Sequence, residues 1–279
     1  MRTNIFSESF IKDFFSNNLG KKYLHKKKML ENSHDIMNLD ILNEMLSTKS
    51  YWNNKNFKMV LDKKPINYSN FSSLSLEHST EILRPDVDKV QNWISKGSSI
   101  VLTEIDKLTN RLNNIIRELQ NLTNGKCQGN LYFSMQSRQA FGPHCDDHDV
   151  FAIHFEGEKV WNIYETVEKD PINHPMFKYS AEEREKKAGK IIDQVTLKPG
   201  DLLYLPRGQY HDALASQNGA IHIAFGLTYF KPIDLLSHLW EKFIVNDYMR
   251  QDIEKNITNE GLKNNLKKMS LEISGIIND

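Results

Sequence analysis

The sequence predicts a mainly β protein in which helices precede and follow the β region. Between Gly129 and Phe230 the apolar segments are short, aromatic and β-branched. Gly, Pro or Asn interrupts them roughly every eight to twelve residues, as in an antiparallel barrel or sandwich. Outside this region apolar residues repeat at helical spacing. Hydrophobic residues make up 39% of the 279 residues, which suffices for a core and excludes a fully disordered chain.

The N-terminal region, residues 1–97, is expected to combine helices and strands and to pack on the barrel. A helix is predicted over 7–16, where two phenylalanines share one face, and a strand over 57–61. Pro85 and Gly97 stand where helix start and stop signals are expected around an apolar repeat. We therefore predict a second helix between them.

The predicted barrel domain covers residues 98–231. Within it, residues 104–122 show the clearest helical stripe, with apolar residues on one side and charged or amide residues on the other. Gly157 is expected to turn one hairpin, and Asn218–Gly219, a type I′ signal, another. The strands are expected at 130–135, 148–156, 158–164, 191–197, 201–205, 210–216 and 220–229.

Residues 165–190 interrupt the rhythm of short strands. Ser180 and Glu183 form a capping-box pattern ahead of a charged helix, and Gly189 ends it. Two interpretations remain open for this insertion. It is either a lid over the barrel or an inert excursion on the surface.

Residues 232–279 are predicted to be helical. Their first part carries a broad apolar face, and the more polar part after Met249 again has apolar residues at helical spacing. A helical hairpin with such a face could pack on the barrel or on a second subunit. The residues of the first face are Leu235, Leu236, Leu239, Trp240 and Phe243.

Charge and cysteine content exclude several classes. The 36 basic and 36 acidic residues give a net charge of zero, so nucleic acid is not an expected partner, and the lysine run over 21–28 is interpreted as a solvated face. The two cysteines, Cys127 and Cys145, make a disulfide scaffold or a Cys-type zinc site improbable. No signal peptide and no apolar stretch of about 20 residues is visible, so we expect a cytoplasmic protein without a membrane partner.

The segment His144-Cys145-Asp146, together with His211, carries the chemical signal. In an extended segment residues i and i+2 point to the same side, so His144 and Asp146 could reach one metal ion while Cys145 faces away. His211 follows a Pro206–Gly208 turn and could supply a third ligand from another strand. Two imidazoles and one carboxylate suit non-haem Fe(II) and leave coordination positions open. The spacing alone is a weak signal, because His and Asp are common polar residues.

Two longer segments, 141–161 and 197–211, resemble the iron-binding core of the JmjC/cupin-like Fe(II)- and 2-oxoglutarate-dependent oxygenases. The similarity covers roughly residues 98–230 and is greatest to the ribosomal-oxygenase and asparaginyl-hydroxylase branch. It implies a double-stranded β-helix, also called a jelly roll, with Fe(II) held by His144, Asp146 and His211. It further implies 2-oxoglutarate as cosubstrate and O₂ as oxidant.

The same resemblance suggests which residues bind the cosubstrate. Lys159 occupies the place of the family's Lys or Arg that holds the distal carboxylate of 2-oxoglutarate. Asn130 and Tyr132 alternate on one face of the strand that leads to the site, and His222 lies in the last strand. These three residues are expected to contact the cosubstrate, with ordinary strand or core positions as the alternative. His154 and Gly226 depart from the family's pattern, which leaves the finer contacts open.

The resemblance implies a hydroxylase that acts on an amino-acid side chain of a protein or peptide and releases succinate and CO₂. One alternative keeps this chemistry but changes the substrate to a free amino acid, another small molecule or a tRNA base. A second alternative is a cupin-like binding module without catalysis. The resemblance and the apolar C-terminal helix together favour a homodimer.

Overall fold

The computed structural model describes residues 5–135, 139–253 and 258–278. The chain divides into two compact units, Met1–Tyr229 and Phe230–Asp279. The first unit contains the sheet and all of the predicted site residues. The second unit consists of helices.

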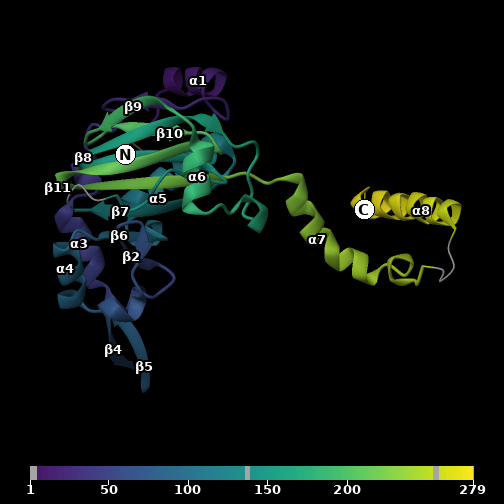
Figure 1. Ribbon diagram of the computed structural model, residues 1–279, viewed down its shortest axis with the longest axis horizontal. Helices are drawn as coiled ribbons and strands as arrows, with labels where there is room; N and C mark the ends of the chain where they lie inside the picture. Colours follow the sequence, from purple (N-terminus) through teal and green to yellow (C-terminus); the bar gives the residue numbers. More distant parts are fainter. Residues whose placement is uncertain (1–4, 136–138, 254–257, 279) are drawn as a thin grey trace. The chain divides into compact units, whose positions relative to one another are not determined.

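A nine-stranded antiparallel sheet forms the first unit (Figure 1). Its strands are ordered β1-β10-β8-β11-β7-β6-β2-β3, and β9 pairs with β8 beside this path. Strands from the first 97 residues therefore extend the same sheet that carries the predicted barrel. The bounds are β1 Leu24–Lys26, β2 Phe57–Leu61, β3 Lys64–Pro65, β6 Ser99–Thr103, β7 Lys126–Ser134, β8 Asp149–Val167, β9 Ile191–Leu197, β10 Leu202–Leu205 and β11 Gln209–Thr228.

The two hairpins predicted at Gly157 and at Asn218–Gly219 are wrong. β8 and β11 each run through these positions as one long strand, and they pair with each other from Gln209↔Val167 to Leu227↔Asp149. The register of this pairing shifts between Ala215 and Ala220. Gly157 and Gly219 do have positive φ angles, of 68° and 84°. A positive φ occurs in an irregularity within a strand as well as in a hairpin turn, so the glycines were correctly taken as special positions but their interpretation as hairpin turns was wrong.

Replacement of Gly157 by alanine is expected to destabilise the protein by about 3 kcal/mol or more. A Cβ atom at this position would lie 2.0 Å from the Gly219 carbonyl oxygen, which is backbone and cannot rotate away. Gly20 is the matched control, because its φ of +67° is nearly the same and nothing lies within 4 Å of its Cβ position. Gly20→Ala should therefore cost only about 1 kcal/mol, the strain of the left-handed backbone alone. Urea unfolding of both variants measures the difference, and equal losses would contradict the steric explanation.

Helices cover the sheet, and several follow the predicted bounds closely. Helix α1 is Glu8–Asn17, and Phe14 on its inner face packs edge-on against Tyr204 at 4.7 Å between ring centroids. The predicted 104–122 helix divides into a 3-10 turn and α5, Asn110–Thr123, whose apolar stripe is buried against β7. The remaining helices of this unit are α2 Ser33–Ile36, α3 Leu39–Ser47, α4 Val87–Ser95 and α6 Ala181–Ala188.

A separate hairpin of β4, Ser72–Glu77, and β5, Thr80–Pro85, projects from the sheet in Figure 1 and was not predicted. Its presence corrects the expected helix start at Pro85. This proline ends β5, and α4 begins after Asp86, whose carboxylate accepts the Lys89 N–H as an N-cap. The proline lies two residues before Val87, the first residue of the helix.

The second unit contains α7, Pro232–Val245, and α8, Asn259–Asn278. The Tyr248 hydroxyl donates to the Asn265 carbonyl at 3.2 Å and joins the segment after α7 to α8. Much of the predicted apolar face is exposed, including Trp240 at 61%. In the part of the chain that the structure describes, no helix has the length and hydropathy to span a membrane.

Candidate metal centre

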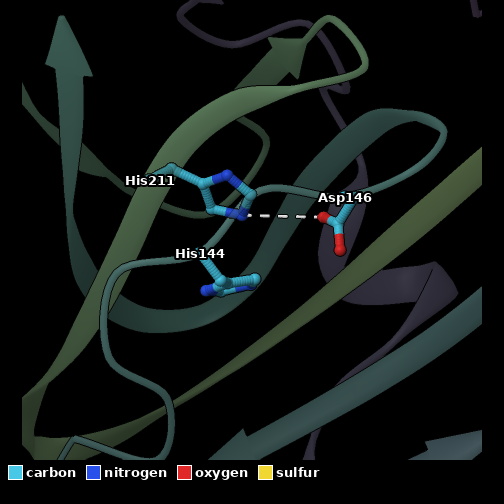
Figure 2. Close-up of side chains that lie close together, drawn as sticks. All are labelled: His144, Asp146 and His211. Carbon is cyan, nitrogen blue, oxygen red and sulfur yellow. Dashed lines mark ion pairs between the residues drawn. The ribbon is translucent and has the colours of Figure 1, made fainter. Parts of the chain in front are cut away.

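The structure brings the three predicted ligands together. One ligand atom each from His144, Asp146 and His211 lies within 4.8 Å of the others, and His211 Nε2 lies 3.7 Å from Asp146 Oδ2 (Figure 2). This spacing matches a set of groups that surround one small ion. His144 and Asp146 come from the loop before β8, and His211 comes from the start of β11.

Backbone hydrogen bonds hold the loop against β11. His144 and His211 form an isolated antiparallel bridge, in which the His144 N–H donates to the His211 carbonyl at 3.0 Å and the reverse bond is 2.8 Å. The Gly208 N–H donates to the Asp146 carbonyl at 3.0 Å. Two residues far apart in the sequence are thus placed by pairing, which the sequence order alone does not reveal.

Each imidazole is oriented by its Nδ1 atom. His144 Nδ1 lies 2.9 Å from the Gly142 carbonyl oxygen, and His211 Nδ1 lies 2.9 Å from the Gln209 carbonyl oxygen. A carbonyl only accepts, so Nδ1 carries the proton in both rings. The lone pair of Nε2 is therefore available to a metal ion, the arrangement that orients histidine ligands in metal sites.

The charges of the cluster also suit a cation. Burial by itself would raise the pKa of Asp146, but the nearby imidazoles of His144, His211 and His148 hold it below its usual value. Burial, with a smaller contribution from His144, lowers the pKa of His211 to about 4. At neutral pH the centre therefore offers an ionised carboxylate and a neutral imidazole, the protonation states in which these groups bind metals.

The cluster opens into a cavity of about 250 Å³ that Lys159 also lines. Lys159 is only 5% exposed, and its ammonium group lies 3.4 Å from His222 Nδ1. Burial lowers the pKa of Lys159 to about 7. Apart from Asp146, no carboxylate belongs to the described residues that line this cavity. A buried cation in such surroundings suits an anionic ligand.

Two of the other predicted cosubstrate residues line the cavity and one does not. The rings of Tyr132 and His222 stack at 4.7 Å with an interplanar angle of 7°. Burial, followed by the charge of Lys159, lowers the pKa of His222 well below its usual value, so this ring is neutral. Asn130 lies two residues before Tyr132 but is not among the cavity-lining residues. Its buried Oδ1 has no hydrogen-bond partner among the described residues.

The structure adds residues that the sequence analysis did not single out. Trp161 lines the cavity and stacks on His211 at 5.7 Å between ring centroids, and Phe141 lies beside His144 with 41% of its surface exposed. Strand alternation from Lys159 could have identified Trp161, because residues i and i+2 share a face. Cys145 faces away from the ligands, as predicted, and packs against Tyr164 and Tyr210.

Comparison with known proteins shows which family this chain is similar to. Residues 102–235 match the family model of the JmjC domain. The chain is 28% identical over 222 residues to a Dictyostelium discoideum protein named bifunctional lysine-specific demethylase and histidyl-hydroxylase NO66, covering 78% of this chain and 41% of that protein. It is 32% identical over 123 residues to Bos taurus ribosomal oxygenase 2, covering 44% of this chain and 25% of the relative. This chain thus spans less than half the length of either relative.

A solved structure has the same fold. YcfD, a ribosomal oxygenase from Escherichia coli solved in complex with cobalt and 2-oxoglutarate, superimposes with a TM-score of 0.63 at 18% identity. The match covers 94% of this chain and 66% of that chain. Together with the antiparallel sheet and its flanking helices, this likeness confirms the predicted JmjC/cupin-like fold. Residues 102–235 are therefore similar to the JmjC domain family, and the chain is similar to ribosomal oxygenases within that family.

Proposed function

We propose that this protein is an Fe(II)- and 2-oxoglutarate-dependent hydroxylase that acts on an amino-acid side chain of a protein or peptide. One observation carries the proposal: a His-Asp-His cluster with free Nε2 atoms and a buried lysine line the same cavity. The cluster provides metal ligands, and the lysine provides a cation for a carboxylate. Neither half of this arrangement would be needed in a cavity that only binds an apolar molecule.

His144, Asp146 and His211 would hold the iron on one side and leave positions open on the other. Iron with 2-oxoglutarate and O₂ supplies the oxidising chemistry: one oxygen atom enters the substrate C–H bond, and the other enters succinate as CO₂ is lost. Lys159 would bind the distal carboxylate of 2-oxoglutarate. His222 would accept a hydrogen bond from the lysine, and Tyr132 and Asn130 would complete the cosubstrate contacts.

The apolar part of the cavity wall would exclude water and position the substrate. Trp161, Val150 and Ala224 line the cavity together with the metal cluster. Water exclusion matters because it strengthens the charge interactions inside the site. The protein thus contributes the open ligand set, the anion anchor and the orientation of the target C–H bond.

A protein or peptide substrate is supported by the relatives, whose names include histidyl-hydroxylase and ribosomal oxygenase. We favour a stable hydroxylated product over a step toward demethylation, although the name of the Dictyostelium relative includes both activities. Nucleic acid is not a proposed partner, since the chain carries no net charge.

We also propose a separate role for each of the three regions of the chain. Residues 98–231 would form the catalytic barrel, residues 1–97 would support it, and residues 232–279 would join two copies in a homodimer. The exposed apolar side chains of α7 support the last part, because a monomer gains nothing from a face that contains Trp240 and Val245 in water. Sedimentation analysis of the wild type and of Trp240→Glu tests it, and a wild type that is monomeric at all concentrations would refute the dimer.

The hydroxylase proposal is tested by incubating the protein with Fe(II), 2-oxoglutarate, O₂ and peptide libraries. The expected result is succinate formation together with a peptide product that has gained one oxygen atom. Succinate with free amino acids or tRNA but not with peptides would instead favour the small-molecule or tRNA-base alternative. Anaerobic titration with Fe(II) and 2-oxoglutarate should give a visible charge-transfer band. A protein that gives neither the band nor succinate would be a binding module.

A further inference from the structure

Residues 165–190 contact the metal-binding loop and its neighbouring turn. None of the described residues that line the cavity comes from this insertion. The insertion leaves β8 at its C-terminal end and returns at β9 through α6. A lid would need a contact with the cavity opening, so the position of the insertion indicates another role.

The beginning of the insertion is bonded to the turn that holds Asp146. The Glu168 N–H donates to the Gly208 carbonyl at 2.8 Å, and the Gly208 N–H donates to the Asp146 carbonyl at 3.0 Å. No side chain fits at Gly208, where a Cβ would lie 2.0 Å from the Glu168 carbonyl oxygen. A continuous chain of backbone hydrogen bonds therefore runs from the insertion to the predicted carboxylate ligand.

The end of the insertion reaches the same loop from its other side. Ala188, the last residue of α6, is fully buried in a small cluster with Tyr164 and Tyr210. Cys145 lies between the two ligands of the loop in the sequence and packs against this cluster. Movement of α6 would therefore displace the loop residue that separates His144 from Asp146.

Hydrogen bonds and an ion pair also connect residues within the insertion. The Glu165 N–H donates to the Lys190 carbonyl and the Lys190 N–H to the Glu165 carboxylate, both at 2.9 Å. Lys187 on α6 pairs with Glu168 at 2.9 Å and lies over the ring of Tyr179 at 4.1 Å. The two ends of the segment are thus bonded to each other.

We propose that residues 165–190 are a fixed brace that positions the His144–Asp146 loop for metal binding, with Ala188 as the contact residue. This inference rests on the proposed metal site and deepens it. In metal sites, groups that orient the ligands without touching the ion change metal affinity by about 10–100-fold when they are altered. The brace would therefore control the affinity of the centre through packing and backbone hydrogen bonds, without touching the ion.

Ala188→Val adds two methyl groups inside the cluster, whereas Ala181→Val makes the same change at the exposed first residue of the same helix. Ala188→Val is expected to raise the Kd for Co²⁺ about tenfold and to alter the visible absorption of the bound ion. Ala181→Val should match the wild type in both. The double variant Cys145→Ala/Ala188→Val should recover most of the affinity, because removal of the sulfur makes room for the methyl groups.

Thermal unfolding of the metal-free proteins shows whether each variant folds, and Ala188→Gly, which loosens the same contact, replaces Ala188→Val if the valine does not fit. A folded Ala188→Val with the Kd and spectrum of the wild type would overturn the brace and leave the hydroxylase proposal intact. A wild type that does not bind Co²⁺ would instead refute the metal site itself. Rapid proteolysis within 165–190 that 2-oxoglutarate suppresses would show a lid and also overturn the brace.

Discussion

Replacement of Asp146 by alanine is expected to abolish metal binding and succinate formation together. The substitution removes the only carboxylate among the described residues of the cluster and leaves two imidazoles. Two ligands are too few to hold Fe(II) in a facial arrangement. We expect the Kd for Fe(II) or Co²⁺ to rise by more than about a hundredfold. This increase is larger than the one expected when a residue that only orients a ligand is replaced. Anaerobic metal titration measures the loss directly.

Asp147→Ala is the matched control, because it makes the same change one residue further along the loop. The Asp147 carboxylate accepts from His148 at 2.9 Å and is not part of the three-residue cluster. This variant should bind metal within about threefold of the wild type, as expected for a half-buried side chain outside the ligand set. Equal losses in the two variants would mean that the loop, and not the carboxylate ligand, had been disturbed.

Replacement of Lys159 by alanine is expected to raise the Kd for 2-oxoglutarate about a hundredfold while metal affinity stays within about threefold of the wild type. The loss corresponds to one charge-assisted hydrogen bond in a buried site, roughly 2.7 kcal/mol. Lys198→Ala is the control, since this lysine pairs with Glu158 at the surface and lies outside the cavity lining. Titration of the charge-transfer band gives both affinities. If the Kd for 2-oxoglutarate is unchanged in Lys159→Ala, the lysine does not bind the cosubstrate.

The same lysine predicts a dependence of cosubstrate affinity on pH. Burial lowers the pKa of Lys159 to about 7 in the free protein, so the neutral amine becomes the main form as the pH rises above this value. Only the ammonium form attracts the distal carboxylate. The Kd for 2-oxoglutarate should therefore increase about tenfold per pH unit above pH 7, until the lysine also loses its proton in the complex. In Lys159→Arg the side chain stays charged, so a shallower pH dependence of the Kd is expected.

The ligand set was predictable because it depends on local chemistry. His144 and Asp146 alternate in one short segment, and His211 from β11 lies beside them in the structure, while Cys145 between them packs against a separate cluster. Lys159 was assigned by resemblance, and the structure places its buried ammonium group in the same cavity. Asn130 shows the limit of alternation, since it shares a strand face with Tyr132 but does not line the cavity.

The path of the long strands was not predictable from local signals. Gly157 and Gly219 need a positive φ in a hairpin and in a strand irregularity alike, so the residues cannot distinguish the two. The pairing of β8 with β11 along nearly their whole lengths determines that both run as continuous strands. This pairing is a contact between distant parts of the chain. The β4–β5 hairpin was not predicted, although Leu74 and Leu76 alternate with polar residues as in a strand; both leucines are exposed in the structure and cover no core.

By itself, the sequence determined the β-rich class and a set of candidate metal ligands, and resemblance to a known family added Lys159 as a candidate. Only the tertiary structure decided that β8 and β11 run as long paired strands, which residues enclose the cavity, and that the 165–190 insertion contributes none of the described residues that line it. These features depend on packing and pairing between segments far apart in the chain, whose free energy no local pattern encodes.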